Sequence, residues 1–111
     1  MDSMTPYCHA IEEIFRGWER RLGPEADFRI DSIVDPEVGR YLLVEIGWDG
    51  YRRIYHTLVH IDTMDGKLWI QKDDTEQGIA SELVSAGVPR DRIVLGFKHG
   101  SLRPYTEFAA A

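Results

Sequence analysis

Apolar residues recur every three or four positions between residues 7 and 22, which predicts an amphipathic helix. Thr5 is predicted to cap this helix and Pro6 to be its first residue, because proline has no backbone N–H to leave unpaired. Gly23-Pro24 is predicted to end it. The side that we expect to pack on a core carries Tyr7, Ile11, Ile14, Phe15, Trp18 and Leu22.

After Asp27 the hydrophobic period changes to two, which predicts strands over about 28–34, 41–48, 51–63 and 67–71. In the third strand we expect one face to carry Tyr55, Thr57, Val59 and Ile61, and the other His56, Leu58, His60 and Asp62. The tight turns are predicted at Asp35-Pro36, Asp49-Gly50 and Asp65-Gly66. For Asp49-Gly50 we expect a type I′ turn, in which both central residues have positive φ. Short turns between successive strands predict an antiparallel meander.

A second helix is predicted to start at Thr75 or Glu76 and to end before Gly87, with Pro89 just beyond. Residues 93–97 form either a brief strand or a segment packed under the sheet edge. The tail, residues 98–111, has no periodicity; it folds back over its own sheet, which we favour, or reaches a partner or a second subunit. The predicted fold is α+β over a single domain, residues 1–111: a four-stranded antiparallel meander sheet packed by an N-terminal helix, followed by the second helix and the short apolar segment.

Composition narrows the class of protein. The 111 residues include 19 acidic and 13 basic side chains, for a net charge of −6. Because DNA affinity rests largely on cationic side chains, we expect no direct sequence-specific DNA binding. Cys8 is the only cysteine, which excludes an intrachain disulfide and suits a reducing cytoplasm. Neither a signal peptide nor a membrane-spanning run is apparent, so we expect a cytoplasmic protein without membrane contact.

An acidic cluster at residues 73–76 has two interpretations. In the first, Asp73 and Glu76 form the reciprocal capping arrangement at the start of the second helix, where acidic groups are stabilised by the helix dipole. In the second, they join His60 and Asp62, with His56 nearby, in a metal or acid–base site. The chain lacks an H-E-x-x-H, C-x-x-C or calcium-loop motif, so capping is favoured and no cofactor is expected.

The chain resembles the XisI family in four stretches that match in order and spacing: YLLVEIGWDGYRRIY, HIDTMDGKLWIQKDDTE, GIASELVSAGVPRDRIVLGF and RPYTEFA. The resemblance implies a small α+β fold, the XisI-like fold, without an assigned catalytic site. It also implies an association with heterocyst differentiation and fdxN element excision in cyanobacteria. There, family members act beside a site-specific recombinase and a companion protein of the XisH family, which is similar to nuclease-type folds.

These observations favour a non-enzymatic accessory protein that regulates a DNA-processing partner, expected to be a XisH-like protein, through protein contact. The side chains that we predict to contact the partner are Trp48, Tyr51, Arg52, Arg53, Arg103 and Tyr105. One alternative is a small metal-dependent hydrolase or nuclease that uses His60, Asp62, Asp73 and Glu76. Another is a small-ligand-binding module with a pocket between helix and sheet. The edge strands of the predicted sheet would also allow a homodimer by strand addition.

Overall fold

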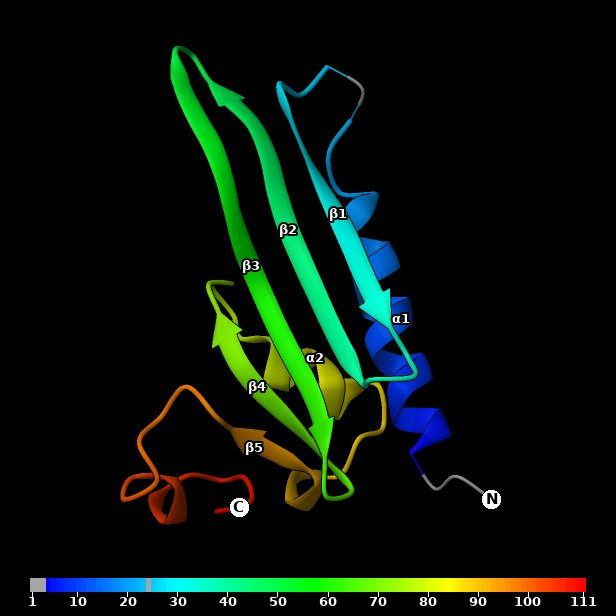
Figure 1. The fold of residues 1–111 in the computed structure, drawn as a ribbon, viewed down its shortest axis with the longest axis vertical. Helices are drawn as coiled ribbons and strands as arrows, with labels where there is room; N and C mark the ends of the chain where they lie inside the picture. The colour runs from blue at the N-terminus through cyan, green and yellow to red at the C-terminus, as the bar shows by residue number, and fades with distance from the viewer. Residues whose placement is uncertain (1–3, 24) are drawn as a thin grey trace.

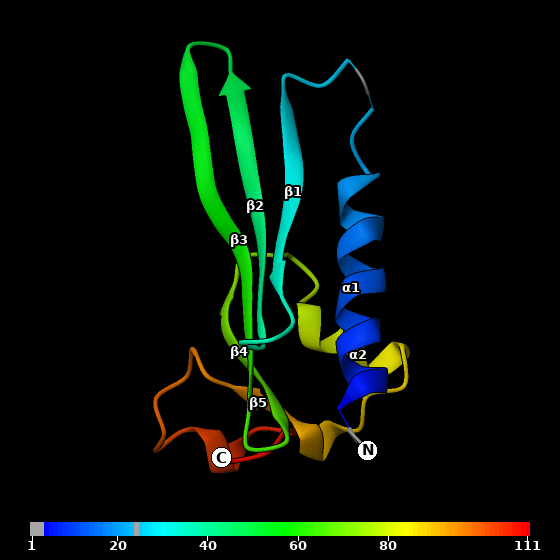
Figure 2. The same cartoon turned by 45° about the vertical axis from the view of Figure 1, so that its right-hand side comes forward.

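The computed structural model describes residues 4–23 and 25–111. The elements are α1 (Thr5–Glu19), β1 (Phe28–Asp35), β2 (Arg40–Asp49), β3 (Arg52–Met64), β4 (Lys67–Asp73), α2 (Ile79–Ser85), a 3-10 turn (Arg90–Arg92), β5 (Ile93–Leu95) and a second 3-10 turn (Arg103–Tyr105). The strands form one sheet in the order β1-β2-β3-β4-β5 (Figure 1). Both α-helices lie on the same side of this sheet (Figure 2).

The sheet has five strands and is mixed, so the prediction of four antiparallel strands was incomplete. The first four strands form the expected antiparallel meander. The chain then crosses through α2 and returns as β5, whose Ile93 pairs with Leu68 in a parallel register. Parallel neighbours require a crossover of this kind, whereas antiparallel neighbours need only a tight turn. The segment after the second helix is therefore a brief strand, and the α+β class is confirmed.

The two predicted Asp-Gly turns differ in geometry. Asp65 and Gly66 both have positive φ, 53° and 75°, as a type I′ turn requires. At the β2–β3 turn, however, Asp49 pairs with Arg52, so the central residues are Gly50 and Tyr51. Gly50 has φ 61° and Tyr51 does not have a positive φ. The type I′ prediction for Asp49-Gly50 was therefore wrong, and glycine occupies the first central position instead.

A β-bulge divides β3 into two parts with opposite alternation. Leu43 pairs with Val59, but the next residue of β2, Val44, pairs with Thr57, so Leu58 is an extra residue. Beyond the bulge, Val59 and Ile61 face the helices and are fully buried. Before it, Tyr55 and Thr57 face the other side. The prediction that these four residues share one face was wrong, because strict alternation fails at a bulge.

The ends of the helices differ from the predictions. Thr5 is the first residue of α1 rather than its cap, and Met4 takes the capping position. The helix ends at Glu19, before Gly23, and Pro24 lies outside the described residues. Helix α2 begins at Ile79, later than the predicted start. No helix within residues 4–23 and 25–111 is both long and apolar enough to cross a membrane.

The core fills the space between the helices and the sheet. It contains Ile11, Phe15, Ile30, Tyr41, Leu43, Leu58, Val59, Ile61, Leu68, Ile70, Ile79, Ala80, Leu83, Val88, Ile93 and Leu95. Cys8 is half-buried against this core, as expected for a small apolar side chain.

The C-terminal tail folds back on its own sheet, which confirms the favoured alternative. The backbone N–H of Ala109 donates to the carbonyl of Ile93 at 2.8 Å, and Ala109 forms a parallel bridge with Val94. Phe108 packs against the core. The tail thereby protects the edge of the short strand β5 from solvent.

Candidate functional site

Four of the side chains predicted to contact a partner lie together at the turn that joins β2 and β3, here called the hairpin end: Trp48, Tyr51, Arg52 and Arg53 (Figure 1). Tyr51 is fully exposed and Trp48 is 48% exposed. The guanidinium of Arg53 lies 5.1 Å from the centroid of the Trp48 ring. Arg52 Nη2 lies 3.1 Å from Asp49 Oδ2. Arg52 and Arg53 therefore each have a neighbouring partner within the hairpin end, and the rings of Trp48 and Tyr51 are exposed.

Gly47 allows β1 to come close to the base of the hairpin end. It adopts φ 155°, and a Cβ at this position would lie 2.3 Å from Cα of Phe28. The carbonyl of Gly47 also accepts a hydrogen bond from Arg53 Nη1 at 3.3 Å. A larger residue would separate β1 from β2 and displace this carbonyl, so glycine sets the position of Arg53.

The second 3-10 turn, Arg103–Tyr105, lies in the C-terminal segment at the opposite end of the molecule from the hairpin end (Figure 1). The Arg103 guanidinium lies 5.1 Å from the Trp69 ring centroid, and its Nε donates to the carbonyl of Lys98 at 3.1 Å. Arg103 thus contributes to holding the tail in place, while Tyr105 is 87% exposed. The predicted contact residues therefore form two groups on a molecule 42 Å long, not one surface.

The face of β1, β2 and β3 turned away from the helices, here called the open face, is partly apolar. The strand register places these side chains on the open face: Ile33, Leu42, Val44, Ile46, Tyr55, Thr57 and His60. Ile33 is 55% exposed and Tyr55 is 69% exposed. Among the described residues, no helix lies on this side of the three strands (Figure 2). Exposed apolar side chains that adjoin one another are a usual property of protein-binding surfaces.

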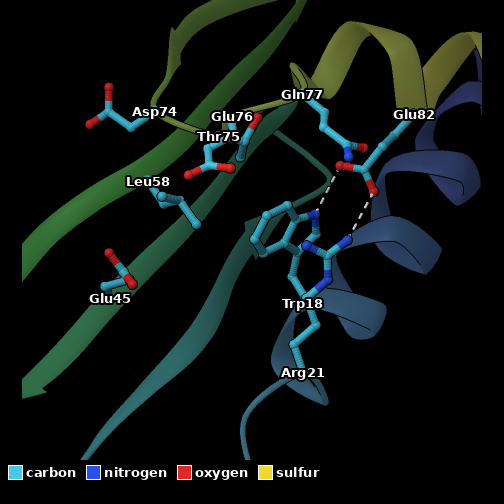
Figure 3. A pocket seen from close by; sticks show the side chains of 9 residues that line it. All are labelled: Trp18, Arg21, Glu45, Leu58, Asp74, Thr75, Glu76, Gln77 and Glu82. Carbon is cyan, nitrogen blue, oxygen red and sulfur yellow. Dashed lines mark hydrogen bonds and ion pairs between the residues drawn. The ribbon is translucent and has the colours of Figure 1, made fainter.

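An acidic cavity of about 370 Å³ lies on the helix side, between α1, the loop before α2, and the sheet (Figure 3). Its walls include Trp18, Arg21, Glu45, Leu58, Asp74, Thr75, Glu76, Gln77 and Glu82. Trp18 Nε1 donates to Glu82 Oε2 at 3.1 Å, and the Arg21 guanidinium stacks 3.6 Å from the Trp18 ring centroid. Arg21 Nη2 also lies 3.8 Å from Glu82 Oε1. These contacts join the end of α1 to α2.

Two other carboxylates of this cavity, Glu45 and Asp74, also have partners. His56 Nε2 lies 2.6 Å from Glu45 Oε1, and its Nδ1 lies 3.8 Å from Asp74 Oδ2. Lys72 Nζ lies 3.3 Å from the same oxygen of Asp74. The cations of Arg21 and Lys72 thus offset part of the negative charge of the cavity. Its side chains serve first to connect the helices to the sheet.

Asp73 caps α2, but from a greater distance than the sequence predicted. Its Oδ2 accepts the N–H of Ile79, the first residue of α2, at 2.7 Å. Its Oδ1 accepts the N–H of Thr75 at 2.9 Å. Glu76 was predicted as the third residue of the helix, a position that Ser81 holds instead. The capping box was therefore wrong in its spacing, and Glu76 is an exposed residue at the cavity.

The residues of the metal-site hypothesis do not come together. His60 Nε2 lies 2.9 Å from Asp62 Oδ1, and both side chains are on the open face, because of the bulge at Leu58. Asp73 binds α2 on the helix side of the sheet. In the part of the chain that the structure describes, no three His, Cys, Asp or Glu side chains are arranged to hold a metal ion.

The contact between Trp18 and Glu82 could not be expected from the sequence. From its helical spacing, Trp18 was predicted to pack on the core. The two partners in the Trp18–Glu82 hydrogen bond are 64 positions apart. Such a pairing depends on how the helices pack and leaves no local pattern.

Fold and surfaces together define a small α+β protein whose most exposed aromatic side chains lie on strands and turns, outside the core. The chain belongs to the XisI family, whose family model, XisI protein, matches residues 1–110. A XisI-like protein from Anabaena variabilis ATCC 29413 has a similar structure, with 33% sequence identity and a TM-score of 0.87, covering 98% of this chain and 100% of that one.

A second similar structure is that of the fdxN element excision controlling factor XisI from the same organism. It shares 37% sequence identity with this chain at a TM-score of 0.80, covering 99% of this chain and 100% of that one. No curated protein matches the sequence. The α+β fold and the family expected from the sequence are thus confirmed.

Proposed function

We propose that this protein is a non-enzymatic regulator of DNA-element excision and that it acts by binding a XisH-like, nuclease-fold protein. The observation that carries the regulatory role is its 37% identity, over nearly the whole chain, to a protein named as an excision controlling factor. The separation of His60 and Asp62 from Asp73 supports a role without catalysis.

The hairpin end supplies the contact surface in this proposal. Tryptophan, tyrosine and arginine are the residues that most often dominate binding energy at protein interfaces. Trp48 and Tyr51 are exposed, and Arg53 is held between Trp48 and the carbonyl of Gly47. Because Trp48 and Arg53 stand on paired strands, binding would order few additional groups there.

The net charge of −6 gives the protein a means to regulate a DNA-processing partner. A protein that binds DNA presents cationic side chains, and an acidic protein is drawn to such a surface. Binding there would exclude DNA. The regulator would then act by competition.

Co-expression with the XisH-like protein of the same genome tests the proposal. We expect the two proteins to co-purify as a complex of defined mass, and we expect added regulator to release DNA from the partner. Raising the salt concentration should weaken the complex, since charge attraction contributes to it. Two proteins that elute separately at low salt would contradict the proposal.

A further inference from the structure

The outer edge of β3 is unpaired over the half of the strand next to the hairpin end. Strand β4 pairs with β3 only from Val59 onward, and the N–H of Asp74 donates to the carbonyl of Leu58 at 2.9 Å. Between residues 52 and 57, no other strand of the described chain lies on this edge (Figure 1). A strand edge of this kind is a template for pairing with another strand.

The register determines which backbone groups point outward along this edge. Arg52 and Asp49 close a two-residue turn, so they form a hydrogen-bonded pair. In an antiparallel ladder such pairs alternate with pairs that do not bond to each other. Ile54 and His56 therefore bond to β2 as Arg52 does, while the N–H and C=O groups of Arg53, Tyr55 and Thr57 point away from it.

We propose that a second copy of this chain pairs with this edge, β3 against β3, in an antiparallel register with a two-fold axis at Ile54. Residues 52–56 of the two copies then oppose each other, and Arg53 forms hydrogen-bonded pairs with Tyr55 of the second copy. In this register, residues whose backbone N–H and C=O groups point outward face each other across the two copies, as an antiparallel ladder requires.

The start of the loop after β4 limits how far the second strand can extend. A two-fold axis at Tyr55 would place Tyr51 of the second copy opposite Val59, where Asp73 already pairs. An axis at Ile54 places it opposite Thr57 instead, next to Asp74. Among the registers that keep outward residues paired, this one matches the longest stretch of strand without overlapping β4.

The side chains of the edge are complementary to themselves in this register. Ile54, which is half-buried in one copy, meets Ile54 of the other at the axis. Arg53 opposes the exposed ring of Tyr55 of the second copy, an arrangement that favours a cation–π contact. Arg52 opposes His56 of the second copy.

The group around His56 adds charge complementarity. His56 lies beside two carboxylates, 2.6 Å from Glu45 Oε1 and 3.8 Å from Asp74 Oδ2. The cation of Arg52 from the second copy would approach them. Two-fold symmetry forms each of these contacts twice, as in an isologous interface. The dimer does not depend on the XisH-like partner, and its two sheets would be continuous.

Cysteine cross-linking of the isolated chain tests the register. In a Cys8→Ser background, Ile54→Cys would place two thiols opposite each other in a non-hydrogen-bonded pair, where Cα atoms lie about 4.5 Å apart and a disulfide can form. We expect mild oxidation to convert most of this variant to a covalent dimer. Arg52→Cys and His56→Cys are the matched controls.

Neither control variant alone should form a disulfide-linked dimer, because its thiol and the symmetry-related thiol lie roughly 14 Å apart along the strands. A mixture of the two controls should cross-link to each other. An Ile54→Cys variant that stays monomeric, or that cross-links no faster than Arg52→Cys, would overturn the proposal. Because the partner protein is absent, neither result bears on the proposed regulatory function.

The mass of the unmodified chain in solution provides a second measurement. Tyr55→Pro removes an N–H that points outward and leaves the bonds of Ile54 and His56 to β2 in place. We expect the native chain to show a concentration-dependent dimer and this variant to show at least tenfold weaker association. A native chain that remains monomeric at millimolar concentration would overturn the proposal as well.

Discussion

The hairpin end and the acidic cavity carry similar side chains, but they use them differently. At the hairpin end, Arg53 stacks on Trp48, five positions away, and both side chains remain at the surface. At the cavity, Arg21 stacks on Trp18, but Trp18 also bonds to Glu82 in another helix. An arginine stacked on a tryptophan thus helps to connect α1 to α2 at the cavity. At the hairpin end, the same kind of pair remains exposed. Trp48 is therefore a better indication of a partner-binding surface than Trp18.

Substitution in the core of the helix side should have the largest effect on stability. Leu83 of α2 is fully buried against the sheet, so Leu83→Ala is expected to lower the free energy of unfolding by about 2–5 kcal/mol. Tyr51→Ala at the hairpin end should change it by less than about 0.5 kcal/mol, because the ring is fully exposed. Urea titrations of both variants measure the two values, and equal losses would contradict this contrast.

Removal of the distant cap should have an intermediate effect. Asp73→Ala leaves the N–H groups of Thr75 and Ile79 without their acceptor and should destabilise the protein by about 0.5–2 kcal/mol. Glu76→Ala, in the same loop, serves as the control and should have little effect. Added zinc or magnesium should not change the melting temperature of the native chain. A metal-dependent rise that Asp73→Ala abolishes would favour the metal-site hypothesis instead.

Loss of the hydrogen bond between Trp18 of α1 and Glu82 of α2 should have a smaller effect. Trp18→Phe keeps an aromatic ring for Arg21 but removes the donor to Glu82, so we expect a loss of about 1 kcal/mol. Glu82→Gln keeps an acceptor and should cost less. Thermal unfolding followed by circular dichroism distinguishes the two variants, and a neutral Trp18→Phe would show that the hydrogen bond adds nothing to stability.

The elements that could be predicted from the sequence are those that depend on residues close together in the chain. The first helix, four of the strands and the Asp65-Gly66 turn follow from periodicity and from the need for positive φ. The bulge at Leu58 could not be predicted, because Leu58 and Val59 are both apolar and either could face the core. Three-residue β5 is likewise defined by its distant pairing with β4 rather than by its own pattern.

The same division applies to the candidate site. Six contact residues were predicted, and the four at the hairpin end lie together because they are near one another in the chain. Arg103 was predicted as a surface contact, but the fold brings Trp69 beneath it. The remote capping by Asp73 also escaped prediction, since the loop with Gly78 at φ 88° separates it from the start of α2. The surroundings of Arg103 and the capping by Asp73 both depend on contacts that local sequence patterns do not predict.

Titration calorimetry of the XisH-like protein with hairpin-end variants tests whether the hairpin end is the contact surface. Because exposed interface aromatics often contribute more than 1 kcal/mol each, Trp48→Ala with Tyr51→Ala should weaken binding by roughly tenfold or more. The control is Tyr105→Ala, which removes an 87% exposed tyrosine at the opposite end and should bind like the native chain. Undiminished binding by the double variant would contradict the account.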